Sequence, residues 1–480
     1  MGQDIERSEF TEEDFAEFSR RLRDETATLA RWFDEGTLDE DHWVGGFELE
    51  AWLADQDWAP APLNGALLER LDDPLLTTEL ARFNIELNTE PRPLRADALE
   101  SMELSLADTW RRCRNGAAAL GARLLMIGIL PTVRQADLTG ESMTPIARYA
   151  ALNEQILRQR DGRALSLDIC GRERLHASHP DVMLESAATS FQIHLQTPAS
   201  RAADYFNASM LVSGPMVAIG ANSPYLFGHD LWDETRIPLF EQSVEAGGFA
   251  GARQGPPRRV GFGTGFVRES LMECFRENLE HFPVILPMHF DDPDAPPLPH
   301  LQLHNGTLWR WNRPLVGMAD GVPHVRIEHR VVPGGPSVTD EIANAAFYYG
   351  LVRYYASRHG SPPGQLLAFP RVRDNFYACA RYGLNARVGW SDGQVHPVGR
   401  LLLEHLLPCA RVGLREFEID SAAIDHYLDV IRQRVRSGYN GAGWQRAWVA
   451  RHGRDMRALT AAYAEHQAGG DPVHTWGLDD

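Results

Sequence analysis

Four short stretches of the chain alternate between polar and apolar residues. They occupy 46–50, 84–90, 190–196 and 326–331. Successive side chains of a β-strand point to opposite faces of its sheet, so each stretch predicts a strand with one apolar and one polar face. Taken singly, such a strand is typical of an antiparallel sheet that turns its polar face towards water.

The polar positions of these four stretches share an unusual chemistry. They are Glu48 and Glu50 in the first, Asn84, Glu86, Asn88 and Glu90 in the second, Ser190, Gln192, His194 and Gln196 in the third, and Arg326, Glu328 and Arg330 in the fourth. Carboxylates with a single imidazole suit Mg²⁺ or Mn²⁺, and arginines suit phosphate oxygens. Taken together, the four strands therefore predict a surface that binds divalent cations and phosphates.

Apolar residues at helical spacing predict the helices, of which the first is the best defined. Thr11 and Asp14 form a capping-box pattern, and Phe10 and Phe15 a hydrophobic staple. Helices are expected over 11–33, 102–122, 143–159, 269–280, 340–358, 396–407, 419–436 and 444–466. Strands and helices do not alternate regularly, which favours an α+β fold. Glycine- and proline-rich stretches at 247–265 and 286–299 are expected to be loops.

The composition removes several classes of function. All 47 cationic residues are arginine, so a Walker A loop, a kinase lysine and a Schiff-base enzyme are excluded. The net charge of −19 argues against a nucleic-acid partner. The five cysteines are widely spaced and predict reduced thiols. We found neither a signal-peptide pattern nor an apolar run of about 20 residues, so we expect a cytoplasmic protein with no membrane partner.

Two other motifs carry less weight. The glycine-rich run 261–265 lacks the last glycine of a dinucleotide-binding motif and has no βαβ surroundings, so a flexible loop is favoured over a nucleotide site. Ser213 and Ser223 lack the context of a hydrolase nucleophile.

In order and spacing, the four stretches resemble the second class of glutamate–cysteine ligases and the related bacterial carboxylate–amine ligases. Further motifs carry the likeness: 79–91, the turn at 221–224 followed by Arg236, 326–347, 381–388 and 441–445. The resemblance covers roughly residues 40–450 and implies a glutamine-synthetase-like fold, in which an antiparallel sheet has a polar concave active-site face and helices on its outer face. We accordingly predict an N-terminal helical extension over 1–40, a catalytic domain over 41–465 and a tail over 466–480.

The resemblance also implies roles for individual residues. Magnesium ligands would be Glu48, Glu50, Glu79, Glu86 and Glu328. ATP and the other substrates would be bound by Arg236, which would hold the α-carboxylate of the amino acid, by Asn88, and by His194, Gln192, Gln196 and Arg326. Arg330, with Glu328, would act on the transferring phosphoryl group. Family members often carry His-x-His on the central strand, where this chain has Gln192 before His194.

The expected reaction is ATP- and Mg²⁺-dependent, with Mn²⁺ as a possible substitute. The γ-carboxylate of glutamate would attack ATP to form an acyl phosphate, which the amine of cysteine would then attack. Two alternatives stay open: a ligase with another amine or amino acid as substrate, and a catalytically silent nucleotide-binding or regulatory homologue.

Overall fold

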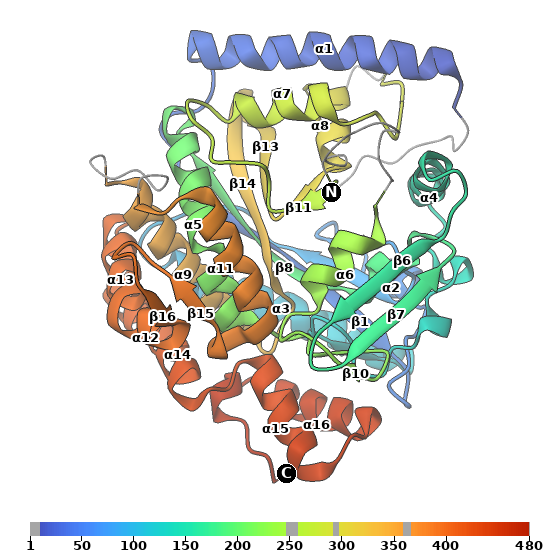
Figure 1. The fold of residues 1–480 in the computed structure, drawn as a ribbon, viewed down its shortest axis with the longest axis vertical. Coiled ribbons are helices and arrows are strands. Elements are labelled where there is room, and N and C mark those ends of the chain that lie inside the picture. The colour runs from blue at the N-terminus through green and yellow to red at the C-terminus, as the bar shows by residue number, and fades with distance from the viewer. Residues whose placement is uncertain (1–9, 246–257, 291–296, 359–365, 480) are drawn as a thin grey trace.

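The centre of the fold is an eight-stranded antiparallel sheet (Figure 1). The computed structural model describes residues 10–245, 258–290, 297–358 and 366–479. The strand order is β13-β14-β8-β1-β3-β2, and β4 and β5 pair with β1. The strands are β1 (Val44–Ala54), β2 (Leu76–Thr78), β3 (Asn84–Asn88), β4 (Arg92–Pro93), β5 (Arg123–Leu125), β8 (Ser190–Thr197), β13 (Asn312–Ala319) and β14 (Val322–Pro333). All four strands predicted from alternation are confirmed.

The register of the strands brings their polar positions onto one face. Glu48 on β1 lies opposite Gln192 on β8. Glu50 lies opposite Glu86 on β3, and His194 lies opposite Glu328 on β14. Residues that are directly opposite in a ladder point to the same face, so side chains from four strands share one surface.

The other face of the sheet is apolar and is covered by helices. α5 (Ala202–Gly220) packs on β14, and α9 (Val338–Ala356) packs on α5 and contacts β8. Tyr349 of α9 stacks on Phe47 of β1. An outer layer of α11 (Phe369–Tyr382), α13 (Leu407–Glu416) and α14 (Ser421–Ser437) packs on these two helices (Figure 1). The predicted placement of helices on the outer face is confirmed.

The N-terminal helix crosses one end of the molecule. α1 (Glu12–Glu35) packs on α7 (Met272–His281) and α8 (Pro299–Gly306) (Figure 1). The predicted capping box of Thr11 and Asp14 is present, and the rings of Phe10 and Phe15 lie 6.4 Å apart. The division of the chain at residue 40 stays a prediction.

The remaining elements pack around the central sheet and its helices. They are α2 (Asn64–Leu71), α3 (Ala98–Ala119), α4 (Ala147–Gln159), the hairpin β6 (Leu165–Cys170) and β7 (Arg174–His179), the short pairs β9 (Tyr225–Leu226) with β10 (His229–Asp230) and β11 (Val260–Gly261) with β12 (Trp309–Arg310), the pair β15 (Arg387–Gly389) and β16 (Val395–Pro397), and α6 (Arg236–Ser243). Within these described elements no helix has both the length and the apolar character needed to span a membrane.

Two helix predictions near the C-terminus differ from the structure. The helix expected over 444–466 is two helices, α15 (Gly441–His452) and α16 (Met456–Gly469), because Gly453 breaks it with φ +90°. The helix expected over 396–407 begins as α12 (Val398–Leu401) and continues through a π-helical turn into α13. α16 runs past residue 465, and the division of the chain there stays a prediction. Of the loops expected at 247–265 and 286–299, residues 247–257 and 291–296 lie outside the described residues.

Candidate active site

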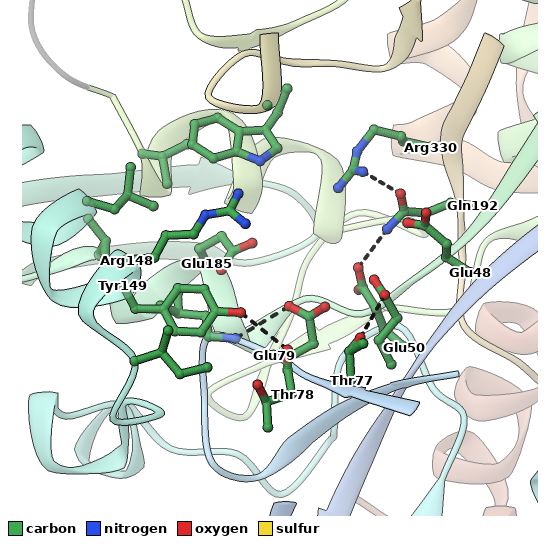
Figure 2. A pocket seen from close by; sticks show the side chains of 18 of the residues that line it. Glu48, Glu50, Thr77, Thr78, Glu79, Arg148, Tyr149, Glu185, Gln192 and Arg330 are labelled. Carbon is green, nitrogen blue, oxygen red and sulfur yellow. Dashed lines mark hydrogen bonds between the residues drawn. The ribbon is translucent and has the colours of Figure 1, made fainter. Parts of the chain in front are cut away.

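The polar face of the sheet borders a cavity of about 350 Å³. β1, β3, β8, β13 and β14 line one side of it, and α4 with the helical turn at Val182–Ala187 lines the other (Figure 2). Its charged lining residues are Glu48, Glu50, Glu79, Glu86, Glu185, Arg148, Arg313 and Arg330. Acids from distant parts of the sequence therefore face one cavity, together with three arginines.

Glu50, Glu79 and Glu86 form the first acidic cluster. One carboxylate oxygen from each lies within 4.8 Å of the others. Burial and the neighbouring acids raise the pKa of Glu79 well above its usual range. Burial raises the pKa of Glu50 to about 7, against the opposing effect of Arg330. Arg330 offsets only part of this crowding of carboxylates, and oxygen ligands suit Mg²⁺. The donor set therefore fits a divalent cation.

Glu48, His194 and Glu328 form the second cluster, and their ligand atoms also lie within 4.8 Å of one another. His194 Nε2 is buried without a hydrogen-bond partner among the described residues and lies 3.2 Å from Glu48 Oε1. Arg326 Nε donates to His194 Nδ1 at 3.3 Å, so a neutral ring carries its proton on Nε2. In this state His194 is a donor towards carboxylate or phosphate oxygens, and the two glutamates supply the metal-binding oxygens.

Glu328 is neutralised by two arginines. Arg313 donates from Nε and Nη2 to its two oxygens at 2.8 and 2.9 Å, and Arg330 Nη1 donates to Oε2 at 3.0 Å. Burial alone would raise the pKa of Glu328, but these two cations lower it to about 2. A carboxylate offers about four acceptor positions, so the Oε1 atom that lies 4.0 Å from His194 can still bind a metal ion.

A β-bulge in β14 sets the position of Arg330. Between the pairs His329–Ile193 and Val332–Phe191, β14 has one residue more than β8. The carbonyls of Arg330 and Val331 accept hydrogen bonds from Arg236 Nη2 at 3.2 and 2.7 Å. The guanidinium of Arg330 points into the cavity and donates to Gln192 (Figure 2).

Arg236 has surroundings that differ from those of the other predicted substrate-binding residues. Its side chain is buried, pairs with Glu234 at 3.0 Å and lies 5.3 Å from the ring of Trp311. It is not among the residues that line the 350 Å³ cavity. These contacts support the backbone of β14, and the predicted contact with an α-carboxylate has no counterpart in the geometry.

A second cavity, of about 930 Å³, lies at the other end of the polar face. Five predicted residues line it: Glu48, Asn88, His194, Gln196 and Arg326. Glu48 lines both cavities. Gln192 donates to Glu50 at 2.9 Å and lines the smaller cavity. Glu328 lines neither cavity, but it contacts Arg313 and Arg330 of the smaller one and His194 of the larger one. Apart from Arg236, the predicted site residues therefore lie in or beside these two cavities.

Sequence reasoning missed four residues of the smaller cavity: Arg148, Tyr149, Glu185 and Arg313. Arg148 and Tyr149 begin α4, and Figure 2 shows the guanidinium of Arg148 pointing into the cavity from the side opposite Arg330. Burial, with Glu50 nearby, raises the pKa of Glu185 to about 8. Arg313 reaches the cavity from β13, where it lies opposite Glu328 of β14.

Comparison with known proteins agrees with this geometry. The model of glutamate–cysteine ligase family 2 (GCS2) matches residues 44–465. The chain belongs to glutamate–cysteine ligase family 2. The predicted resemblance is thereby confirmed, and ligation of a carboxylate to an amine with ATP is the reaction class that the family supports. No curated protein sequence matches the chain.

Solved structures resemble this family member at low identity. The glutamate–cysteine ligase of Francisella tularensis, in complex with AMP, is 11% identical with a TM-score of 0.52, over 92% of this chain and 91% of that one. A bifunctional glutathione synthetase from Pasteurella multocida is 12% identical with a TM-score of 0.46, over 94% and 54%. A glutamine synthase homologue is 12% identical with a TM-score of 0.31, over 93% and 74%. The predicted glutamine-synthetase-like α+β fold is confirmed.

Proposed function

We propose that this protein uses ATP and Mg²⁺ to join the γ-carboxylate of glutamate to the amine of cysteine. The observation that carries the proposal is the gathering of Glu48, Glu50, Glu79, Glu86 and Glu328 on one sheet face beside Arg330. ATP carries about four negative charges, and a carboxylate adds another, so they can meet only where cations screen them.

The two acidic clusters would hold the divalent cations. Glu50, Glu79 and Glu86 would bind one ion, and Glu48 with Glu328 would bind another. When bound, these ions neutralise phosphate charge and align the reacting groups.

The sizes of the two cavities suggest where each substrate binds. The 930 Å³ cavity has apolar lining residues such as Leu38, Val44 and Met318, and it suits a nucleoside. The 350 Å³ cavity is rich in charge and suits amino acids. Glu48 lines both, so the transferred phosphoryl group would lie near it.

The protein's own residues would then act in two steps. In the first, an oxygen of the γ-carboxylate attacks the γ-phosphorus of ATP, the bond to the bridging oxygen breaks, and ADP leaves with the bonding electron pair. Arg330, with its raised pKa, stays cationic and stabilises the transferring group. In the second step, the amine attacks the acyl carbon, phosphate leaves, and the amine loses a proton as the amide forms.

Arg148 is the residue that would hold the α-carboxylate of the amino acid. Its guanidinium points into the cavity from α4, opposite the reacting end at Arg330 (Figure 2). A glutamate that extends between them would direct its γ-carboxylate at the phosphoryl group. This assigns to Arg148 the role that the sequence suggested for Arg236.

The direct test is an assay of ADP release with Mg-ATP, glutamate and cysteine, with the dipeptide identified by mass spectrometry. We expect ADP release to require all three substrates and Mg²⁺. ADP release with glutamate and a different amine would move the assignment to another carboxylate–amine ligase. An absence of Mg-ATP binding by calorimetry would indicate a silent homologue instead.

A further inference from the structure

A separate cavity of about 180 Å³ lies outside the catalytic region. It is formed by β11 and the glycine-rich loop that follows it, by β12 and by one face of α11. Its lining shares no residue with that of the 350 Å³ cavity. Its volume is below the range of about 300–1,000 Å³ that is usual for drug-sized ligands, so it suits a small ion.

The charge around this cavity is unbalanced. Four arginines and two glutamates line it: Arg258, Arg259, Arg310, Arg373, Glu241 and Glu277. Glu277 is paired with Arg310 at 2.9 Å. Glu241 is buried, accepts hydrogen bonds from Trp311 and Tyr377, and has a pKa that burial raises. Arg373 lies 3.9 Å from the exposed Asp374, so little negative charge is left to balance Arg258 and Arg259.

Arg259 is the most unusual of these cations. It is only 5% exposed, and its guanidinium donates to the carbonyl and hydroxyl oxygens of Thr307 and to the carbonyl of Pro283. Among the described residues, no carboxylate lies within ion-pair distance of it. Burial lowers the pKa of Arg259 to about 9, which still leaves it charged at neutral pH. A buried charge without a counter-charge is costly unless an anion accompanies it.

Arg310 adds unused donors. Its side chain is 8% exposed, and its Nε is buried without a hydrogen-bond partner in the described part of the chain. Its Nη1 faces Gly263, where an added Cβ would lie 4.0 Å away. Gly263 has φ +94°, a conformation that favours glycine and lets the loop backbone lie close to this guanidinium.

We propose that this cavity is a binding site for a small oxyanion, a phosphate or a carboxylate. The ion would accept hydrogen bonds from Arg310 Nε and Nη1 and would balance the charge of Arg259. The exposed side chain of Arg373, on α11, would close the site from its outer side. This gives the run 261–265 a role in anion binding, which differs from the nucleotide loop considered from the sequence.

The test is titration calorimetry of the full-length protein with inorganic phosphate, in EDTA and with chloride at matched ionic strength. Acetate in a parallel titration separates a carboxylate preference from a phosphate preference. We expect one binding event for at least one of the two ions. Arg310→Gln should weaken it by about tenfold or more, because charge-assisted hydrogen bonds are lost.

Matched variants decide where the anion binds. Arg373→Gln should weaken binding, whereas Arg371→Gln, an exposed position on the same helix outside the cavity lining, should not. Arg330→Gln, in the catalytic cavity, should also leave binding unchanged. Because Arg373 is exposed, this comparison remains valid if Arg310→Gln does not fold. Loss of binding in Arg330→Gln but not in Arg373→Gln, or no binding of either ion, would overturn the proposal.

Discussion

Arg313 and Glu328, opposite each other on β13 and β14, form a two-point ion pair in which both nitrogens lie within 2.9 Å of the carboxylate oxygens. This geometry holds the Glu328 side chain in one orientation beside His194 and Arg330. The pair therefore links the edge of the sheet to the reacting centre.

We expect Arg313→Lys to lower kcat/KM by roughly 100-fold, because lysine keeps the charge but cannot make both hydrogen bonds. Steady-state ADP release measures the effect, and thermal unfolding checks that the variant is folded. Turnover equal to that of the unmodified protein would show that the orientation of Glu328 is unimportant.

Removal of one charge from the acidic cluster of Glu50, Glu79 and Glu86 should stabilise the metal-free protein and weaken its binding of Mg²⁺. Without divalent ions, Glu79→Gln should raise the free energy of unfolding by about 1 kcal/mol, because one repelling carboxylate is removed. The same change should weaken Mg²⁺ binding by about tenfold or more. Denaturant unfolding in EDTA and calorimetry with Mg²⁺ test both effects, and the exposed Glu141→Gln is the matched control. Unchanged Mg²⁺ affinity would remove Glu79 from the metal site.

Arg148 should control the affinity for the amino acid alone. Arg148→Met is expected to raise the KM for glutamate by roughly 10- to 100-fold and to leave the KM for ATP unchanged, because a charged hydrogen bond to one substrate is lost. Arg158→Met, on the exposed face of the same helix, is the control. An equal rise in both KM values would contradict the assigned role.

Arg236 should behave differently, because it contacts the backbone of β14. Arg236→Lys is expected to lower kcat by about 10-fold or more through displacement of Arg330, with little change in the KM for glutamate. A selective rise in that KM would instead support the substrate contact that the sequence suggested. Separate measurement of kcat and KM distinguishes the two roles.

The buried His304 predicts acid sensitivity. Its Nε2 donates to the carbonyl of Asn278 at 3.0 Å, and its Nδ1 has no partner among the described residues. Burial, with the Arg259 cation nearby, lowers its pKa to about 4 from the usual 6.5. As the pH falls below about 6.5, this histidine is therefore protonated in the unfolded chain but stays neutral in the folded protein. The free energy of unfolding decreases until the pH reaches about 4, where the folded protein is protonated as well.

From pH 7 to pH 5, His304 should lower the free energy of unfolding by about 2 kcal/mol. Urea unfolding at the two pH values measures the change. His304→Gln, which keeps a donor for Asn278, should remove most of the difference. An equally steep pH dependence in that variant would assign the acid sensitivity to other groups.

The sequence predicted the strands and helices that have one apolar and one polar face. The four alternating strands and the amphipathic α1 and α14 were found from periodicity. α5 was missed, because 17 of its 19 residues are buried and it therefore has no polar stripe. Pro215 lies inside that helix, a position where proline is normally disfavoured.

Site residues that lie on these strands were predicted from the sequence. Site residues that other parts of the fold bring to the cavity were missed. Glu48, Glu50 and Glu86 follow from alternation, whereas Glu79 came from the family resemblance. Arg148 and Glu185 come from segments outside the sheet, and only the fold brings them to the cavity. Arg313 depends on cross-strand register, which the spacing of residues along one chain does not reveal.

The additional residue in β14 means that the backbone itself sets the position of Arg330. After Val331 the alternation of inward and outward side chains restarts, which places Val332 opposite Phe191, on the face that packs against the helices. If the same residues paired with β8 regularly, without the bulge, Val331 would lie opposite Phe191 and Val332 opposite Ser190, near Glu50. Deletion of one residue here would therefore remove the bulge and leave Val332 opposite Phe191, so it would change the position of Arg330 without moving the residues that follow it.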